Sequence, residues 1–251
     1  MQAMGPGTEL LLDLAGVGVG GCVLDLGTGA GDQAILAAQR VGACGRILAT
    51  DISSAMLDLT RAAADAAGLV NVQTQVMDAQ QLPLDDASFD AVIARFSLQF
   101  VPDVQRALAE VRRVLKPDGR FAAMVYSAIE KNPYRAGSQA IASRLVRRPF
   151  PEPGPGQWAL NDPATLTHAF HQAGFRAVEV QVVPITWRFP SVADALQNLE
   201  EAQPIFAKLM AQLSEVDRAT AKAEIERMLH SFTGPHGFAA PSEALIVAGA
   251  R

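Results

Sequence analysis

Short apolar runs alternate with helical patterns through the first half of the chain. The runs are continuous rather than alternating, as in strands buried on both faces of a sheet. The segments between them carry apolar residues three and four positions apart, which predicts helices packed on that sheet. The pattern therefore predicts a doubly wound α/β fold with a mostly parallel sheet. The expected strands are Val23–Leu26, Arg46–Thr50, Val72–Met77, Phe89–Ala94 and Arg120–Val125, and the expected helices are Thr8–Leu14, Asp32–Arg40, Ser53–Ala67 and Pro102–Leu115.

The second half of the chain continues this alternation with longer segments. A proline- and glycine-rich loop, Pro149–Gly156, separates two helical patterns, and a long helical insertion precedes the last apolar run. We interpret the insertion as a lid over the carboxyl ends of the strands, where open α/β sheets bind their ligands. A dimerisation surface is the alternative interpretation. The expected elements are helices at Asn132–Arg148 and from Asp162-Pro163 to Gly174, a strand at Arg176–Phe189 (or two, broken near Pro184), helices within Ser191–His230, and a last strand at Ala244–Ala248.

A glycine-rich loop follows the first expected strand. Gly27, Gly29 and Gly31 stand at alternate positions, and a helix is expected to begin at Asp32. Glycine allows a sharp turn and a close approach of the backbone to a ligand. The helix amino terminus adds partial positive charge beside that loop. The loop therefore predicts a nucleotide-type pocket.

Two acids and a methionine extend this pocket. Asp51 ends the second strand, about twenty residues past the glycines, where a carboxylate can accept both hydroxyls of a ribose. Asp78 ends the third strand beside Ala79 and is placed to accept from an adenine amino group. Met56 lies on the following helix, where its thioether can pack on the adenine face. Each residue alone is also explained as a helix cap or core residue, but their order predicts a nucleoside site.

These motifs resemble those of class I S-adenosylmethionine-dependent methyltransferases, and the chain is similar to their ubiquinone/menaquinone-biosynthesis group. The resemblance covers about residues 20–127 and implies a single methyltransferase domain over 1–251. Its implied fold is a Rossmann-like, mostly parallel seven-stranded sheet, with a cofactor-binding core at 20–127 and helical lid or substrate segments at 128–160 and 190–238. The family's last strand, here Pro241–Arg251, enters antiparallel beside the fifth. The motif stretches are Val23–Asp32, Ile47–Ser53 with Met56, Met77–Ala79 with Leu82-Pro83, Phe89–Val92 and Arg113–Arg120.

The resemblance also implies the cofactor, S-adenosylmethionine, with S-adenosylhomocysteine as its product. Asp25 and the glycine loop would hold the methionine portion, Asp51 the ribose, and Asp78 with Ala79 the adenine. Ala30 and Arg95 fall where the family also contacts the cofactor. The expected cofactor-binding residues are Asp25, Gly27, Thr28, Gly29, Ala30, Gly31, Asp51, Ile52, Met56, Asp78, Ala79 and Arg95.

The chain departs from the quinone group after the fourth strand. That group carries phenylalanine-glycine-leucine-arginine-asparagine, whereas this chain has Phe96–Phe100 with the sequence FSLQF, and Arg95 replaces a small hydroxyl residue. We therefore expect a small-molecule acceptor other than a quinol, methylated at carbon, oxygen or nitrogen. The sequence identifies no general base. The substrate-side candidates are Arg95, Gln99, Tyr126 and Tyr134, with Trp158 beside them; core packing is the alternative for Tyr134 and Trp158.

Composition narrows the remaining functions. Hydrophobic residues make up 49% of the 251, and the formal net charge of -5 argues against nucleic-acid binding. No apolar run reaches the roughly 18 residues of a membrane span, and no signal peptide is visible, so a cytoplasmic protein is expected. His168 and His171 lack a third ligand, so no metal is expected. A homodimer is compatible with the insertion.

Two alternative functions remain, together with a question about the amino terminus. A non-methylating S-adenosylmethionine binder, such as a cyclase or sensor, would use the same pocket. An NAD(P)-dependent oxidoreductase fits the glycine spacing less well. The family usually has a longer helical segment before the first strand than the twenty or so residues here. We therefore expect that the insertion or a partner chain covers the pocket, or that the amino-terminal segment is truncated.

Overall fold

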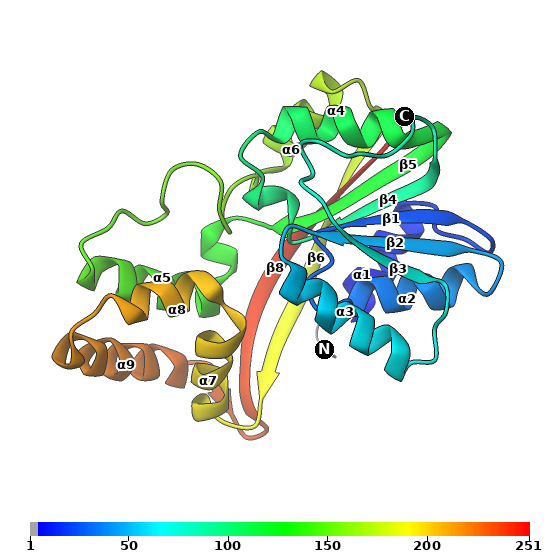
Figure 1. Ribbon diagram of the computed structural model, residues 1–251. Helices are drawn as coiled ribbons and strands as arrows, with labels where there is room; N and C mark the ends of the chain where they lie inside the picture. The colour runs from blue at the N-terminus through cyan, green and yellow to red at the C-terminus, as the bar shows by residue number, and fades with distance from the viewer. Residues whose placement is uncertain (1–4) are drawn as a thin grey trace. The chain divides into compact units, whose positions relative to one another are not determined.

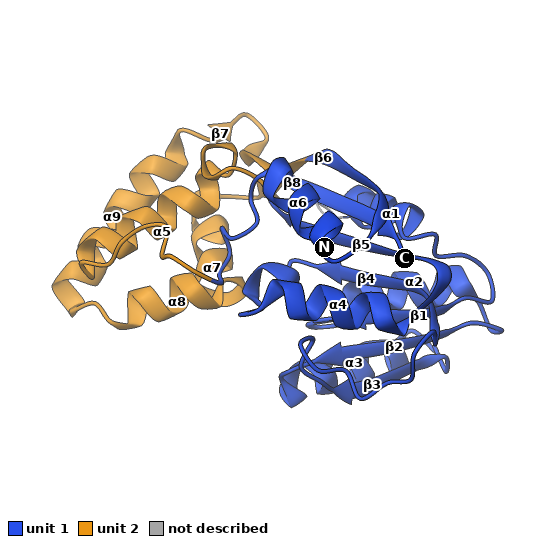
Figure 2. Ribbon diagram, turned by 90° about the horizontal axis from the view of Figure 1, so that it is seen from above, with its two compact units in different colours: residues 1–126, 155–183, 244–251 blue, residues 127–154, 184–243 orange. Residues whose placement is uncertain are grey.

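The chain forms two compact units in the computed structural model, which describes residues 5–251 (Figure 2). The sheet unit contains the described residues up to Tyr126, together with Pro155–Val183 and Ala244–Arg251. The helical unit contains Ser127–Gly154 and Pro184–Glu243. The core expected at 20–127 thus falls in the sheet unit except for Ser127. Of the expected helical segments, residues 155–160 belong to the sheet unit.

The sheet has the expected mostly parallel topology. Its strand order is β3-β2-β1-β4-β5-β8-β6, with the two-residue β7 paired to β8 as an eighth strand. Strands β1 to β5 pair in parallel, whereas β8 runs antiparallel to β5, as predicted for the last strand. The predicted strand at Arg176–Phe189 is continuous through Pro184. The strands are β1 (Cys22–Leu26), β2 (Arg46–Asp51), β3 (Val72–Val76), β4 (Phe89–Arg95), β5 (Leu115–Tyr126), β6 (Arg176–Phe189), β7 (Thr233–Gly234) and β8 (Gly237–Ala250).

Helices cover both faces of the sheet in the sheet unit, which confirms the doubly wound prediction. Figure 1 shows α1, α2 and α3 on one face and α4 and α6 on the other. The helices α5, α7, α8 and α9 belong to the helical unit. The bounds are α1 (Gly5–Leu14), α2 (Asp32–Val41), α3 (Ser54–Ala66), α4 (Val104–Val114), α5 (Pro133–Leu145), α6 (Pro163–Gln172), α7 (Val192–Ala202), α8 (Pro204–Ala211) and α9 (Glu215–His230), with short 3-10 turns η2 (Leu98–Phe100) and η3 (Ile129–Lys131).

The helix boundaries follow from capping side chains. The Asp162 carboxylate accepts a hydrogen bond from the Thr165 backbone N–H at 2.8 Å, and Pro163 occupies the first turn of α6. This helix ends before Gly174, whose φ of 85° lies in the left-handed region that stops a helix. Both signals were visible in the sequence, which is why this helix was predicted correctly.

The residues Lys116–Gly119, which connect the predicted helix Pro102–Leu115 to the predicted strand Arg120–Val125, lie inside β5. The pairing register of β4 with β5 shifts between Phe89 and Ala91, so these residues bulge out of the ladder, and Asp118 has a φ of 65°. The Arg113 guanidinium holds the loop before β4, donating to the carbonyl oxygens of Leu82 at 2.8 Å and Leu84 at 2.7 Å. The Arg113 side chain thereby joins α4 to the loop that precedes β4.

Each unit has its own hydrophobic core. In the sheet unit, Phe121 of β5 stacks on Phe170 of α6 with ring centroids 5.3 Å apart. In the helical unit, Tyr134, Phe206 and Phe238 are fully buried. Because neither core needs residues of the other cluster, each unit has its own source of hydrophobic stabilisation.

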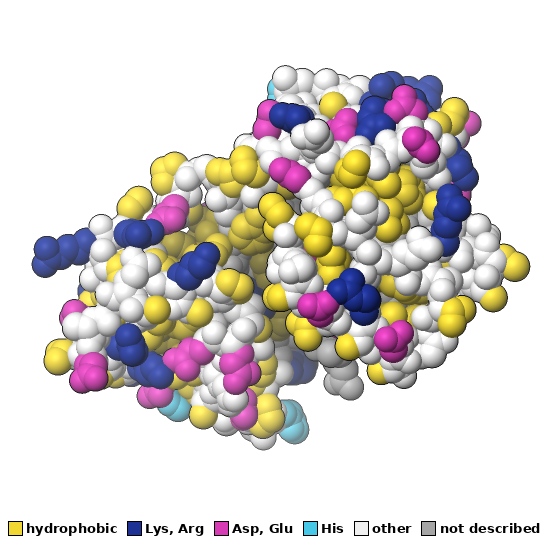
Figure 3. All heavy atoms as spheres, in the orientation of Figure 1, with side chains coloured by type: hydrophobic (Ala, Val, Ile, Leu, Met, Phe, Trp, Pro, Cys, Tyr) yellow, Lys and Arg dark blue, Asp and Glu magenta, His cyan; other side chains and the backbone are white. Residues whose placement is uncertain are grey.

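Charged side chains are distributed without regard to sign on the face shown in Figure 3. Lysine and arginine side chains are interspersed there with aspartate and glutamate. Within residues 5–251, none of the helices combines the length and apolar composition that a membrane span requires.

A buried asparagine organises the beginning of the helical unit. Asn132 Nδ2 donates to the carbonyl oxygens of Ser127 at 3.2 Å and Ala128 at 3.1 Å. Its Oδ1 accepts from the Ser242 hydroxyl and, at 3.1 Å, from the Glu243 backbone N–H. The Asn132 side chain thus joins the segment after β5 to the part of β8 that belongs to the helical unit.

We expect Asn132→Ala to lower the free energy of unfolding of the helical unit by about 2–4 kcal/mol. The substitution leaves several buried polar groups without partners, and each costs about 1–3 kcal/mol if water does not replace the lost bond. Urea unfolding followed by circular dichroism measures the change. Asn161→Ala, at a half-buried residue of the loop before α6, is the control. An unchanged midpoint for Asn132→Ala contradicts the proposed role.

Candidate functional site

The glycine loop connects β1 to α2 with all three glycines at positive φ. The φ values are 67° for Gly27, 59° for Gly29 and 91° for Gly31. A Cβ at Gly27 would lie 2.3 Å from the Ser97 Cβ, and one at Gly31 would lie 3.0 Å from the Thr60 Cα. At Gly29, no heavy atom of the described residues lies within 4 Å of that position. Two glycines therefore allow close packing within the protein, and the middle one borders open space.

Asp25 is completely buried beneath this loop. Its Oδ1 accepts a hydrogen bond from Gln33 Nε2, and its Oδ2 has no hydrogen-bond partner among residues 5–251. Burial raises the pKa of Asp25 to about 7, while the Thr28 and Gln33 side chains and the Arg95 charge act in the opposite direction. Gln33 Oε1 is also buried without a hydrogen-bond partner within this described range. A cationic, hydrogen-bonding ligand would satisfy these groups.

Gln33 was not predicted as a site residue. It lies on the buried face of α2 with Ala34, Ala37 and Val41, where an apolar residue is expected. A glutamine at a helix position where the pattern predicts an apolar core residue was the sequence signal that could have identified it.

Asp51 at the end of β2 holds the glycine loop directly. Its Oδ2 accepts from the Gly29 backbone N–H at 3.0 Å, and its Oδ1 accepts from the Ser53 N–H at 2.9 Å. A carboxylate oxygen can accept more than one hydrogen bond, so both oxygens retain capacity for ligand hydroxyls. The residue can therefore position the loop and bind a ribose at the same time.

Asp78 follows β3 and is fixed by a residue that the sequence did not point to. The Gln80 backbone N–H donates to Asp78 Oδ1 at 2.9 Å, and Gln80 Nε2 contacts both carboxylate oxygens at 3.0 Å. These hydrogen bonds lower the pKa of the exposed Asp78 carboxyl, which keeps it ionised. Oδ2 accepts only from Gln80 in the described chain and can accept an exocyclic amine.

Two large apolar side chains near Asp51 are exposed. Ile52 is 75% exposed, and Met56 on the first turn of α3 is 39% exposed. Ala30 of the glycine loop is also exposed, and Ala79 is partly buried. Exposed apolar groups beside hydrogen-bonding acids are typical of a surface that a flat, partly apolar ligand covers.

Arg95 ends β4 and joins three elements. Its Nη1 donates to the Thr8 hydroxyl of α1 at 2.8 Å, and its Nη2 lies 3.6 Å from Asp32 Oδ2 at the start of α2. Its charge also reaches the buried Asp25 carboxyl. This arrangement places Arg95 next to the predicted cofactor residues, and it fixes the first half of α1 to the sheet.

Aromatic side chains meet at the carboxyl ends of β4 and β5. Phe96 stacks on Tyr126 with ring centroids 4.3 Å apart, and Tyr126 lies 5.7 Å from Trp158. Phe96 has a φ of 57°, an uncommon value for a bulky residue and one that is often stored at functional sites. Phe96 was not among the predicted site residues. The fully buried Gln99 lies in the following η2 turn, with Oε1 lacking a hydrogen-bond partner in the described chain.

Tyr134 lies on α5 and packs within the helical unit. Its hydroxyl donates to the Ala195 carbonyl oxygen at 2.6 Å, and its ring contacts Trp187, Phe189 and Phe238. Tyr134 is therefore packed in a hydrophobic core, which is the alternative interpretation given for this residue. Trp158 belongs to the sheet unit rather than to the helical segments.

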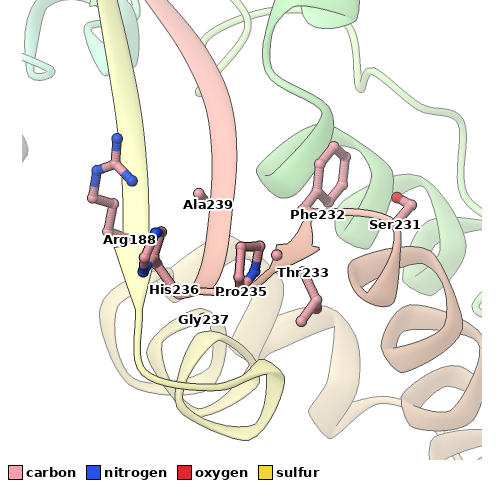
Figure 4. Close-up of a pocket in the computed structure, with 9 residues that line it drawn as sticks. Arg188, Ser231, Phe232, Thr233, Pro235, His236, Gly237 and Ala239 are labelled. Carbon is pink, nitrogen blue, oxygen red and sulfur yellow. The ribbon is translucent and has the colours of Figure 1, made fainter.

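A shallow pocket of about 360 Å³ lies in the helical unit at the β7–β8 turn. Figure 4 shows Arg188 and His236 at β6 and the turn, with Ser231 and Phe232 at the end of α9. None of the predicted cofactor residues lines this pocket. Among residues 5–251, no three histidine, cysteine, aspartate or glutamate side chains are grouped to hold a metal ion.

We expect the stability difference between wild type and Asp25→Asn to depend on pH between about 4 and 7. Folded wild type retains the Asp25 proton up to about pH 7, whereas the unfolded chain releases it near its ordinary pKa of 3.8. Wild-type stability therefore falls as pH rises through this window, by up to about 1.4 kcal/mol per pH unit, and the asparagine variant lacks this dependence. Denaturant unfolding at several pH values measures it. Parallel curves for the two proteins would refute the raised pKa.

Known proteins are similar to this chain over the segment that contains the glycine loop and the acids. A family model described as "Methyltransferase domain" matches residues 24–123. The ubiquinone/menaquinone biosynthesis C-methyltransferase UbiE of Idiomarina loihiensis is 39% identical over 117 residues, which are 46% of this chain and 47% of that protein. The chain thus spans about half the length of the curated relatives it matches.

Solved structures extend the similarity of the fold to nearly the whole chain. The YcgJ protein from Bacillus subtilis superimposes with a TM-score of 0.67 at 19% identity, covering 98% of both chains. The [4+2]-cyclase SpnF superimposes with a TM-score of 0.61 at 22% identity, covering 99% of this chain and 82% of that one. At these identities the likeness shows the fold alone.

The glycine loop, Asp51 and Asp78 all lie within the matched segment, in the order that the sequence resemblance predicted. Residues 24–123 of this chain are accordingly similar to methyltransferase domains, and over this segment the chain is similar to the UbiE C-methyltransferases.

Proposed function

We propose that the protein transfers the methyl group of S-adenosylmethionine to a small-molecule acceptor. The observation that carries the proposal is the set of acids at one edge of three neighbouring parallel strands. Asp25 pairs with Ala49, two residues before Asp51, and Asp51 pairs with Val76, two residues before Asp78. The acids therefore follow one another along the carboxyl edge of the sheet, beside the open backbone of Gly29.

The residues present fit the chemistry of that cofactor. The unsatisfied Oδ2 of Asp25 suits the ammonium group of the methionine portion, and Asp51 suits the ribose hydroxyls. Asp78 and Ala79 suit the adenine edge, and the exposed Ile52 and Met56 suit its faces. The bound cofactor supplies an electrophilic methyl group on a positively charged sulfur.

The chain's own contribution to such a reaction is orientation. Holding the acceptor atom in line with the methyl group can supply about 7–11 kcal/mol of the barrier. Gly27 and Gly31 lock the loop against Ser97 and Thr60, so the cofactor-facing backbone is fixed before binding. A general base is needed only where the acceptor atom must lose a proton during transfer.

We assign the acceptor side to the carboxyl ends of β4 and β5. Phe96 stacks on Tyr126 there, the tilted Trp158 ring lies 5.7 Å from Tyr126, and the buried Gln99 Oε1 can accept a hydrogen bond. This aromatic group favours a partly apolar acceptor. The replacement of the quinone-group signature by Phe96–Phe100 supports an acceptor other than a quinol.

We also propose that the helical unit, which contains most of 128–160 and 190–238, is the lid and substrate segment of the enzyme. The free thiols of Cys22 and Cys44 support a cytoplasmic location. A homodimer is part of the same proposal, and light scattering at micromolar concentration tests it.

Isothermal titration with S-adenosylmethionine and S-adenosylhomocysteine tests the cofactor site. We expect both to bind, and Asp51→Ala to weaken binding at least tenfold because it loses a ribose acceptor and releases the Gly29 N–H. Asp58→Ala is the matched control, since Asp58 lies on α3 at the surface and pairs with Arg61. Absence of binding to wild type refutes the proposal.

Transfer itself is tested with S-adenosylmethionine labelled in the methyl group. We expect label to pass from the cofactor to small molecules of a bacterial extract, with formation of S-adenosylhomocysteine. Chemical change of a substrate without formation of the demethylated cofactor would instead establish a non-methylating S-adenosylmethionine protein. Binding of NADH in preference to either methionine derivative would establish the oxidoreductase alternative.

Substitution of single loop glycines tests the structural role of each position. We expect Gly29→Ala to lower the free energy of unfolding by about 1–2 kcal/mol, the cost of a left-handed conformation, because its Cβ meets no atom of the described chain. Gly27→Ala adds a collision with Ser97 and is expected to destabilise the protein more. Thermal unfolding ranks them. Equal stability losses in the two variants contradict the roles assigned to these glycines.

A further inference from the structure

Gln80 joins the segment after β3 to the start of α4. It lies two residues after Asp78, in the loop that connects β3 to β4. Its Nε2 lies 3.0 Å from both carboxylate oxygens of Asp78, and its Oε1 accepts from the Asp103 backbone N–H at 3.0 Å. The two ends of one side-chain amide therefore have different partners, an acceptor after β3 and a donor at the amino terminus of α4.

The first turn of α4 holds Gln80 in place. Arg106 Nε donates to the Gln80 carbonyl oxygen at 2.8 Å, and the Asp103 carboxylate caps the helix by accepting from the Arg106 backbone N–H at 3.0 Å. The helix is itself anchored in the core of the sheet unit by the fully buried Leu108 and Val111. Gln80 is thus attached to a helix whose position the core fixes.

These contacts fix the orientation of the Asp78 carboxylate. An exposed aspartate otherwise rotates broadly about its terminal torsion. Here Gln80 Nε2 spans both oxygens, and the Gln80 backbone N–H donates to Oδ1 at 2.9 Å. Oδ2 accepts only from Gln80 within residues 5–251, so it keeps capacity for another donor. The backbone and side-chain hydrogen bonds from Gln80, with a smaller contribution from the Arg106 charge, lower the pKa of Asp78, which therefore remains an acceptor.

A fixed, ionised carboxylate distinguishes adenine from its deaminated form, hypoxanthine. Adenine carries an amino group on carbon 6, which donates hydrogen bonds, whereas hypoxanthine carries a carbonyl oxygen there, which only accepts. Hypoxanthine instead has an N–H at the neighbouring ring nitrogen, which a freely rotating carboxylate can reach. The orientation that Gln80 imposes on Asp78 therefore determines which of the two bases is preferred.

We propose that Gln80 is a positioning residue that makes the cofactor site selective for adenine, because it presents one fixed oxygen of Asp78 to the amino group of the base. This role rests on the proposed function, in which Asp78 binds the adenine of S-adenosylmethionine. Gln80 acts through Asp78 rather than on the reacting groups. If Gln80 only attached its loop to α4, its loss would weaken the binding of both bases equally.

Calorimetric titration with S-adenosylhomocysteine and with S-inosylhomocysteine, its deaminated analogue, tests this selectivity. We expect wild type to bind the adenine compound at least tenfold more tightly, since a site built for a donor disfavours an analogue that lacks it. Equal affinities in wild type overturn the proposal. Absence of S-adenosylhomocysteine binding overturns the proposed function itself, and with it the role of Gln80.

Gln80→Glu separates the two contacts of the side chain. An oxygen of the new carboxylate can still accept from the Asp103 N–H, whereas the group that donated to Asp78 is replaced by a second negative charge. We expect the preference for the adenine compound to fall at least fivefold, with the circular dichroism of the folded protein unchanged. Gln80→Leu removes both ends of the amide, is expected to change the preference in the same direction, and serves if Gln80→Glu does not fold.

Gln81→Glu is the matched control. Gln81 is exposed, its backbone N–H donates to the Asp78 carbonyl oxygen at 3.0 Å, and its side chain forms no hydrogen bond within residues 5–251. The same charge is thus added one residue away, and we expect the preference between the two compounds to stay as in wild type. An unchanged preference in both Gln80 variants, or an equal loss of affinity for both compounds, overturns the positioning role and leaves cofactor binding in place. An equal fall of the preference in Gln81→Glu also overturns it.

Discussion

The parallel register of β1 between β2 and β4 is the constraint on which the site depends. It sets Asp25 opposite Ala49 on one side and Ile93 on the other, so that the next residues of all three strands reach the same edge. Asp51 and Arg95, which are far apart in sequence, are consequently brought to the glycine loop. A slip of one residue in β1 would turn Asp25 to the opposite face of the sheet and remove the carboxylate from the loop.

Burial of Asp25 is tolerated because neighbouring groups offset the free energy of desolvating its carboxyl group. Gln33 satisfies one carboxylate oxygen, and the charge of Arg95 opposes the rise in pKa that burial causes. The second oxygen is left for a ligand. An apo protein with a carboxyl group of pKa about 7 is thus prepared to ionise when a cation binds, since opposite charge favours the charged form.

The helical unit has a well-packed core in which buried polar groups form hydrogen bonds within the unit. The Tyr134 hydroxyl donates to the Ala195 carbonyl oxygen, and Asn132 accepts from the Glu243 backbone N–H, so these two residues specify how α5 packs. The Ser138 hydroxyl donates to the Tyr134 carbonyl oxygen one turn earlier on the same helix. Buried polar groups of a folded protein are hydrogen-bonded as a rule, and these bonds let polar side chains lie inside the core.

The sequence by itself determined the succession of strands and helices along the chain, a mostly parallel sheet, the glycine loop and the acids that follow the strands. These features depend on local periodicity and turn chemistry, which short stretches such as Val23–Asp32 carry completely. Only the tertiary structure decided that Gln33 supports Asp25, that Phe96 stacks on Tyr126, and that Tyr134 packs in a second core. It also decided that the insertion forms a unit of its own with residues 127–154. The physical reason is that a side chain's hydrogen-bond and packing partners come from segments far away in sequence, and no local pattern specifies which of them meet.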